Sequence, residues 1–283
     1  MRTLCFDVGG TYIKYAIIEN DRDEIEIKKI KTRITKQDNY ILEDIINTIK
    51  EYENIDAIGV STAGVVDSEK GEIAFSGPTI PNYTGTKIKE SIENIFKVPC
   101  FVENDVNAAA YGEYTYTKSS GTTFMMTIGT GVGGSIILND NVYNGNSMTA
   151  GEIGYMPYKN GYFQDYASAR FLTSYASEKL GFEVDGKYIF ENAKEGNEVC
   201  NEAIETLIEN LCFGILNIIY LLNPKKIIIG GGITAQGTYL EDKIKKQLNK
   251  KIISEKFKTE ICLAKLENSA GLYGMFYITQ KGK

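Results

Sequence analysis

Two short glycine turns, each between two apolar stretches, restrict the folds open to this chain more than any other feature. The first turn is Gly9-Gly10-Thr11, which follows Asp7 and Val8. The second is Gly129-Thr130-Gly131, and it too lies between apolar runs. Apolar runs bounded by glycine are typical of strands. A strand–turn–strand unit that recurs about half a chain later predicts a duplicated protein with two lobes.

The stretches between and after these turns predict helices that alternate with further strands. Isoleucines recur at helical spacing over residues 41–49, and the run 198–222 is long and apolar enough for a buried helix. Residues 165–180 also predict a helix, residues 61–75 a loop and hairpin, and Asp21 to Asp23 a turn. This alternation predicts an α/β fold with a cleft between the lobes. We expect a small N-terminal lobe of residues 1–115, completed by a C-terminal helix at 271–283, and a larger lobe of residues 116–270.

The absence of histidine limits the chemistry that the chain can perform. None of its 283 residues is a histidine, which excludes a Ser-His-Asp triad, a Cys-His dyad and any zinc site that contains histidine. Proton transfer must therefore use a carboxylate, Lys, Tyr or Cys. The five cysteines form no CxC or CxxC pair, so we expect reduced core residues.

Charge and hydropathy exclude further classes of partner. The net charge of -6 argues against nucleic acid and against a membrane surface, since both favour a basic face. No run reaches the roughly 18 apolar residues that span a bilayer. Asp7 interrupts the first apolar run, so we expect no signal peptide there and a cytoplasmic protein.

The two glycine turns are candidates for binding a polyphosphate, because glycine leaves backbone N–H groups unobstructed. Asp7, at the end of the first strand, is placed to hold Mg²⁺ directly or through water. The hydroxyls of Thr11 and Thr130 would add contacts to phosphate. Alternatively, both are ordinary hairpin turns in which glycine only supplies a positive φ. That alternative is favoured for either turn alone, but the two together, with Asp before Gly-Gly-Thr, favour phosphate.

Polar residues at the end of the strand predicted over 98–102 are candidates for the reacting centre. Glu103-Asn104-Asp105 precedes an alanine-rich helix, and ligands bind at this edge of open α/β sheets. Asp105 could accept a proton from a hydroxyl, as a weak base whose charged form the helix dipole favours. A weak base suffices for phosphoryl transfer, which depends mainly on positioning. Helix capping by Asn104 or Asp105 accounts for the pattern equally well.

A third glycine cluster, Gly230-Gly231-Gly232, follows another apolar run. It would let a nucleotide base or ribose approach the backbone. A tight turn from strand to helix explains it equally well.

Taken together, these segments resemble the ROK family of sugar kinases and related repressors, which belongs to the actin-like ATPase superfamily. Five motifs carry the resemblance: DVGGTYIKYAII (7–18), VENDVNAAAYGE (102–113), IGTGVGGSI (128–136), EIGY (152–155) and IIIGGGI (227–233). They occur in the order of the family and cover nearly the whole chain.

The resemblance implies a kinase that uses ATP with Mg²⁺ and phosphorylates the 6-hydroxyl of a sugar, with Asp105 as the catalytic base. The residues implied to bind the nucleotide are Asp7, Gly9, Gly10, Thr11, Lys14, Gly129, Thr130, Gly131, Gly230 and Gly231. Those implied to bind the sugar are Asn82, Asn104, Asp105 and Glu152. Simpler roles stay open: a turn for Asn82, a solvated charge for Glu152, and a solvent-facing side chain for Lys14.

The chain departs from the family pattern around the sugar. The histidine of the ExGH signature is Tyr155, and the cysteine cluster that follows in the family is replaced by residues 161–172. The zinc ligands are absent together, so the chain resembles a zinc-free branch. The glutamate that ends the cluster aligns with Gln164, which keeps an acceptor and loses the charge. Tyr155 and Gln164 are therefore possible replacements for the family's sugar contacts, although Tyr155 could simply be a packing aromatic.

The acceptor is expected to be a hexose or N-acylhexosamine, with N-acetylmannosamine the first choice and glucose or another hexose the alternative. Family habit implies a homodimer. A different class, a non-catalytic sugar-binding regulator, stays open. The chain starts at the first kinase strand, so we expect no room for the DNA-binding domain of the repressors.

Overall fold

The computed structural model describes residues 1–20 and 25–282 and divides the chain into two compact units. Unit 1 comprises Met1–Ser119, Asn144–Ala150 and Asn268–Lys283, and unit 2 comprises Ser120–Tyr143 and Gly151–Glu267. The segment Asn144–Ala150 groups with unit 1, whereas the sequence pattern places it inside the larger lobe. A turn that the sequence predicts at Asp21 to Asp23 lies outside the described residues.

Unit 1 is built on a five-stranded sheet in the order β3-β2-β1-β4-β7. Its strands are β1 (Thr3–Val8), β2 (Tyr12–Ile18), β3 (Lys28–Lys31), β4 (Ala57–Thr62) and β7 (Cys100–Asn104). Strands β1, β4 and β7 are parallel, and β2 and β3 are antiparallel additions. The carboxyl ends of the three parallel strands therefore meet at one edge, where ligands bind in such sheets.

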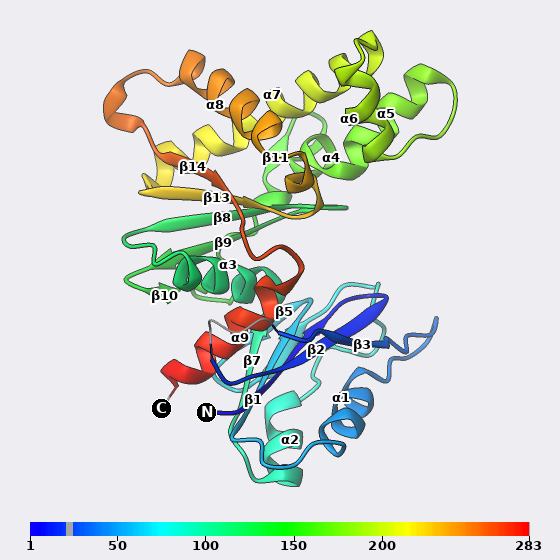
Figure 1. The fold of residues 1–283 in the computed structure, drawn as a ribbon, viewed down its shortest axis with the longest axis vertical. Helices are drawn as coiled ribbons and strands as arrows, with labels where there is room; N and C mark the ends of the chain where they lie inside the picture. The colour runs from blue at the N-terminus through cyan, green and yellow to red at the C-terminus, as the bar shows by residue number, and fades with distance from the viewer. Residues whose placement is uncertain (21–24, 283) are drawn as a thin grey trace. The chain divides into compact units, whose positions relative to one another are not determined.

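Helices cover both faces of this sheet (Figure 1). On one face, α1 (Ile41–Ile49) and α2 (Ile88–Phe96) bury isoleucines against Phe6 and Val60. On the other face lies α9 (Ala270–Lys281), with α3 (Asp105–Tyr116) packed against it. A Cβ at Gly59 of β4 would lie 2.8 Å from the Cβ of Met275. Glycine there lets α9 approach the sheet, so the C-terminal helix completes the N-terminal unit.

A small hairpin of β5 (Val65–Asp67) and β6 (Glu72–Phe75) follows β4. It confirms the hairpin that the sequence predicts over 61–75.

Unit 2 repeats the same topology in a second five-stranded sheet, ordered β10-β9-β8-β13-β14. Its strands are β8 (Thr123–Ile128), β9 (Val132–Leu138), β10 (Asn141–Val142), β13 (Lys226–Gly230) and β14 (Glu260–Leu263). Strands β8, β13 and β14 are parallel, and β9 and β10 are antiparallel. Pair β8–β9 thus matches pair β1–β2, with a glycine turn in each. The α/β fold with a duplicated strand–turn–strand unit is confirmed.

The core of unit 2 lies between this sheet and the long helix α7 (Glu198–Leu222). The remaining helices are α4 (Gln164–Ala167), α5 (Ala169–Leu180), α6 (Gly186–Lys194) and α8 (Thr238–Lys251), with short 3₁₀ turns η1 (Ile153–Tyr155), η2 (Gly232–Gln236), η3 (Glu255–Phe257) and η4 (Glu267–Ser269). In the part of the chain that the structure describes, α7 alone is long and apolar enough to cross a membrane. However, 56% of its apolar window is buried inside the protein, as in a core helix.

Two helical segments differ from expectation. The helix predicted over 165–180 is broken at Ser168, whose extended backbone and side-chain acceptance of the Phe171 N–H start α5 afresh. The pattern of residues 186–194 was too short to predict α6, which Asp185 caps through the N–H of Tyr188.

Candidate active site

The first glycine turn is open at its tip. The N–H of Gly9 donates to the carbonyl of Tyr12 at 3.1 Å, and the Thr32 hydroxyl donates to the Gly9 carbonyl at 2.7 Å. Gly10 and Thr11 are exposed, and a Cβ at Gly10 would meet no atom within 4 Å. The turn is thus held from behind by strand contacts while its outer edge stays free for a ligand.

Asp7 lies beside this turn with both carboxylate oxygens engaged. The Lys14 ammonium lies 3.3 Å from Oδ2, and the Ser61 hydroxyl donates to Oδ1 at 3.2 Å. Lys14 also donates to the Asn268 carbonyl at 3.4 Å, so its side chain contacts the site instead of extending into solvent. The start of α9 covers Asp7, because a Cβ at Gly271 would lie 3.0 Å from Oδ1. A hard-oxygen group in this position fits Mg²⁺ that accompanies a nucleotide.

The junction of β7 and α3 sets the second polar group of unit 1. Asn104 caps α3, since its Oδ1 accepts from the N–H groups of Val106 and Asn107 at 2.9 and 3.1 Å. Its Nδ2 donates to the Gly64 carbonyl and to Oδ1 of Asp105, both at 3.0 Å. The capping role that the sequence left open for Asn104 is therefore confirmed. The same side chain also orients the carboxylate of Asp105, which is partly exposed.

A buried ring of hydrogen bonds supports this junction, and sequence patterns did not single it out. Glu103, 5% exposed, accepts from the Asn104 N–H at 2.8 Å, the Asn107 amide at 3.1 Å and the Ser68 hydroxyl at 2.8 Å. Asn144 closes the ring through Asn107 and Ser68. Burial raises the pKa of Glu103, against these hydrogen bonds that lower it. The ring ties segment Asn144–Ala150 to the strand that ends at Asn104.

Asn82 is placed in a turn. Its backbone has a φ of 54°, and its side-chain amide donates to the Gln37 carbonyl at 3.0 Å. The side chain is exposed. This contact accounts for Asn82 as a turn residue, and no described contact joins it to Asn104 or Asp105.

The second glycine turn, in unit 2, brings a predicted phosphate contact and a predicted sugar contact together. The N–H of Gly129 donates to the Gly131 carbonyl at 3.0 Å, and the N–H of Ala169 to the Gly129 carbonyl at 2.8 Å. Thr130 is exposed at the tip. A Cβ at Gly131 would lie 2.6 Å from Oε1 of Gln164. Gln164 therefore lies directly against the turn, and only glycine admits it there.

Glu152 and Tyr155 lie at the two ends of η1, next to Gln164. A Cβ at Gly154 would lie 3.3 Å from Oε1 of Gln164. Among the described residues, the carboxylate of Glu152 makes no hydrogen bond or ion pair. The surrounding protein raises the pKa of Glu152 by displacing water from its charged form. An unpaired carboxylate in this place is suited to accept hydrogen bonds from the hydroxyls of a ligand.

A short hairpin leads into residues 161–172, the segment that the sequence pattern aligns with the cysteine cluster of the family. It consists of β11 (Pro157–Tyr158) and β12 (Gly161–Tyr162), joined by Lys159 and Asn160. Aromatic rings surround Tyr158. Across residues 1–20 and 25–282, no three His, Cys, Asp or Glu side chains gather to hold a metal. The residues present therefore do not fit zinc.

Gly230 and Gly231 lie where β13 ends. The φ of Gly231 is 90°, and a Cβ there would collide with the Ile128 carbonyl oxygen. Close packing of β13 on β8 thus requires this glycine with or without a nucleotide. Gly232 faces open space, since a Cβ there would meet nothing within 4 Å.

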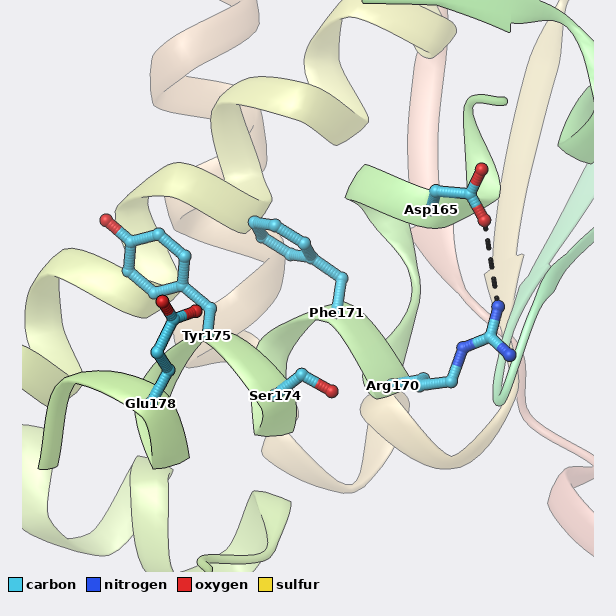
Figure 2. A pocket seen from close by; sticks show the side chains of 6 residues that line it. All are labelled: Asp165, Arg170, Phe171, Ser174, Tyr175 and Glu178. Carbon is cyan, nitrogen blue, oxygen red and sulfur yellow. Dashed lines mark ion pairs between the residues drawn. The ribbon is translucent and has the colours of Figure 1, made fainter. Parts of the chain in front are cut away.

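A cavity of about 250 Å³ lies on α4 and α5, beyond the predicted site residues. Figure 2 shows the carboxylate of Asp165 directed at the guanidinium of Arg170, at 3.7 Å, with the rings of Phe171 and Tyr175 along the wall. The other Asp165 oxygen accepts from the N–H of Tyr162 at 2.9 Å. The ion pair therefore braces strand β12 against α5.

Comparison with known proteins identifies relatives along the full chain. The profile described as "ROK family" matches residues 3–282. An uncharacterized protein of Clostridium perfringens is 43% identical, with 96% of this chain and 95% of that protein covered. A solved structure of a proposed N-acetylmannosamine kinase of Listeria monocytogenes is 28% identical, with a TM-score of 0.88. A ROK glucokinase of Streptomyces griseus, solved with glucose and AMPPNP, is 26% identical, with a TM-score of 0.83. Both alignments cover 100% of each chain.

These matches agree with the two sheets of the same strand order. The chain therefore belongs to the ROK family, and it carries the fold and motifs of a sugar phosphotransferase.

Proposed function

We propose that this protein transfers the γ-phosphoryl group of ATP to the 6-hydroxyl of a hexose or an N-acylhexosamine, with N-acetylmannosamine as the preferred acceptor and glucose as the alternative. The observation that carries the proposal is the carboxylate of Asp105, partly exposed at the end of β7 and oriented by Asn104. The likeness to a glucokinase solved with glucose and AMPPNP supports ATP as the phosphoryl donor and a hexose as the acceptor. The likeness to a proposed N-acetylmannosamine kinase supports the preferred acceptor.

ATP binds with Mg²⁺ as its companion ion. The tips of the two glycine turns, Gly10–Thr11 and Thr130–Gly131, present backbone N–H groups to phosphate oxygens, whereas the N–H groups of Gly9 and Gly129 bond within their own turns. Asp7 holds the ion, directly or through water, and Lys14 adds positive charge beside the phosphates. When bound, Mg²⁺ neutralises charge that develops on the phosphate oxygens. Gly230 and Gly231 border the base or ribose.

Asp105 orients the acceptor hydroxyl. Its carboxylate accepts a hydrogen bond from the 6-hydroxyl and directs the oxygen at the γ-phosphorus. As the new O–P bond forms, the bond from phosphorus to the bridging oxygen of ADP breaks, and the hydroxyl proton passes to Asp105. Because the transition state of phosphoryl transfer is loose, this late proton transfer needs only a weak base. Asn104 keeps the carboxylate in place throughout.

The rest of the sugar is held by Glu152, Gln164 and Tyr155, with Asn82 as a further contact. The unpaired carboxylate of Glu152 accepts from sugar hydroxyls. Gln164 lies against the Gly131 turn, which supports a sugar site next to a phosphate site within unit 2. This proximity is what transfer between the two ligands requires.

An ADP-release assay with Mg·ATP and a panel of N-acetylmannosamine, N-acetylglucosamine, mannose, glucose and fructose tests the proposal. Asp105→Asn should lower turnover by about 10²–10⁴-fold, the range for a proton-transfer group, with sugar binding partly retained. The matched control is Asp185→Asn at the exposed start of α6, where asparagine caps as well as aspartate. Near-normal turnover of Asp105→Asn would refute its role. Sugar binding without turnover in the wild-type protein would instead indicate a sugar-binding regulator.

We also propose a cytoplasmic homodimer. Support comes from apolar side chains left exposed at the end of α7, with Leu221 85% and Tyr220 43% exposed. A Leu221→Asp variant that keeps the mass of the wild-type protein in solution would argue against this surface as the interface.

A further inference from the structure

Two exposed tyrosines form a corner next to the predicted sugar residues. Tyr155 is 60% exposed and Tyr162 is 51% exposed. Their ring centroids lie 5.9 Å apart with the planes at 81°. One ring therefore presents its edge to the other, and large parts of both remain in water. Neither ring is needed to fill the core, so packing inside the protein does not account for the pair.

Backbone hydrogen bonds hold both ends of the corner. Tyr162 pairs with Pro157 across the hairpin, and its N–H donates to Asp165, which Arg170 braces. The N–H of Tyr155 donates to the Glu152 carbonyl at 3.2 Å. The backbone therefore places the two Cα positions, and the edge contact between the rings narrows the rotamers that a ligand must order.

The hairpin itself is fastened to the core helix α7. The hydroxyl of Tyr158 and the ammonium of Lys159 both donate to Oδ1 of Asn210 at 2.9 Å. Asn210 is buried, and its amide donates to the Tyr166 carbonyl at 2.7 Å. The hairpin that carries Tyr162 is thus anchored by protein contacts alone.

The corner is continuous with the residues proposed to hold the sugar. Tyr155 comes three residues after Glu152, and Tyr162 two residues before Gln164. Gln164 in turn packs against Gly154, which directly precedes Tyr155. A sugar held by Glu152 and Gln164 would therefore present a substituent to the two rings.

The chemistry of the corner favours one kind of substituent. A ring hydroxyl gains little from an aromatic face, because it loses water without gaining a hydrogen-bond partner. An acetamido group is planar and ends in a methyl, so it can lie flat on one ring and pack its methyl against the other. We propose that Tyr155 and Tyr162 form a subsite for the N-acyl group of an N-acylhexosamine. The subsite rests on the proposed function, since it assumes that Glu152 and Gln164 bind the sugar.

The sequence contains no tryptophan, so a single introduced tryptophan reports on the subsite directly. Tyr162→Trp keeps an aromatic ring and should change its emission when N-acetylmannosamine is added without ATP, and change far less with mannose. The matched control is Phe182→Trp. Phe182 is also 51% exposed and makes the same kind of edge contact, with Tyr188 at 5.9 Å and 86°, away from the sugar residues. Equal responses of the Tyr162→Trp variant to both sugars, or no response to either, would overturn the subsite.

Steady-state kinetics supply the second measurement. In Tyr162→Ala and in Tyr155→Ala, the ratio of kcat/KM for N-acetylmannosamine to that for mannose should fall about five- to tenfold. This is roughly what burial of one methyl group provides, together with stacking of the amide plane on a ring while the polar edges of the amide stay in water. Phe182→Ala should leave the ratio unchanged. An unchanged ratio in an active protein would refute the subsite alone. Absence of turnover with every sugar in the wild-type protein would refute the proposed function, and the fluorescence titration of Tyr162→Trp would still test the subsite.

Discussion

Substitution of Gly214 by alanine should destabilise the protein, although alanine normally strengthens a helix. Gly214 lies within α7, and a Cβ there would collide with the Phe163 ring, two of whose atoms would lie at 2.8 and 2.9 Å and a third closer still. Phe163 is fully buried, and its ring also contacts that of Tyr158 at a centroid distance of 6.1 Å. The ring therefore has little room to retreat from an added methyl group.

Two opposing free energies decide the outcome. Glycine to alanine inside a helix stabilises by about 0.5–1 kcal/mol. Forcing a methyl into a closely packed core costs about 1–3 kcal/mol. The contacts at Gly214 are shorter than any ordinary carbon–carbon contact, so the second term should exceed the first and leave a net loss of about 1–2 kcal/mol. For a chain of this size, that lowers Tm by roughly 2–3 °C.

Thermal unfolding followed by circular dichroism measures the effect. The matched control is Gly186→Ala at the start of α6, where a Cβ would meet nothing within 4 Å and stability should stay level or rise. In the Gly214→Ala background, Phe163→Leu should recover part of the loss, although the same change alone leaves a cavity. Because Phe163 precedes Gln164, the KM for the sugar should rise in Gly214→Ala. A Gly214→Ala protein more stable than wild type would refute this reasoning.

Three further predictions follow from the site. In Gly271→Ala, the added Cβ would lie 3.0 Å from the Asp7 carboxylate. Tm should stay near wild type, but kcat should fall several-fold because even a small misplacement of a site group slows transfer. An unchanged kcat over a range of Mg²⁺ concentrations would contradict this prediction. Glu103→Ala should lower both Tm and kcat, because it leaves the Asn104 N–H and the Asn107 amide without their acceptor, at a cost of about 1–3 kcal/mol each. Glu103→Gln should keep most of the wild-type Tm and kcat. Equal losses in the two variants would show that the ring does not act through these hydrogen bonds. The pKa of Glu152 is raised by loss of hydration, so ionisation of Glu152 lowers the stability of the protein as pH rises through that pKa. Acidification through the same pKa should raise the KM for the sugar, because the protonated carboxyl accepts hydrogen bonds less well. Glu152→Gln should show a KM that does not change with pH and an equal or higher Tm at neutral pH, and a KM that still changes with pH would point to another group.

Local patterns in the sequence predicted most of the strands and helices and the two glycine turns. The runs around Gly9–Thr11 and Gly129–Gly131 predicted two strand–turn–strand units, and both exist with matching strand orders. The prediction succeeded because strand alternation and glycine turns are recorded within a few neighbouring residues. Asn104 was likewise readable as a helix cap, since a cap bonds only to the next two or three residues.

The tertiary structure alone decided which distant residues support the site. Gly271 covers Asp7 from the opposite end of the chain, and Ser61 reaches the same carboxylate from another strand. The ring around Glu103 requires Asn144, whose segment returns to unit 1 between two stretches of unit 2. The spacing of these residues in the sequence does not predict such contacts, because each contact depends on how whole strands and helices pack. A sequence records the burial of each residue in its local pattern, but the partner that buries it is chosen only when the sheets and helices assemble.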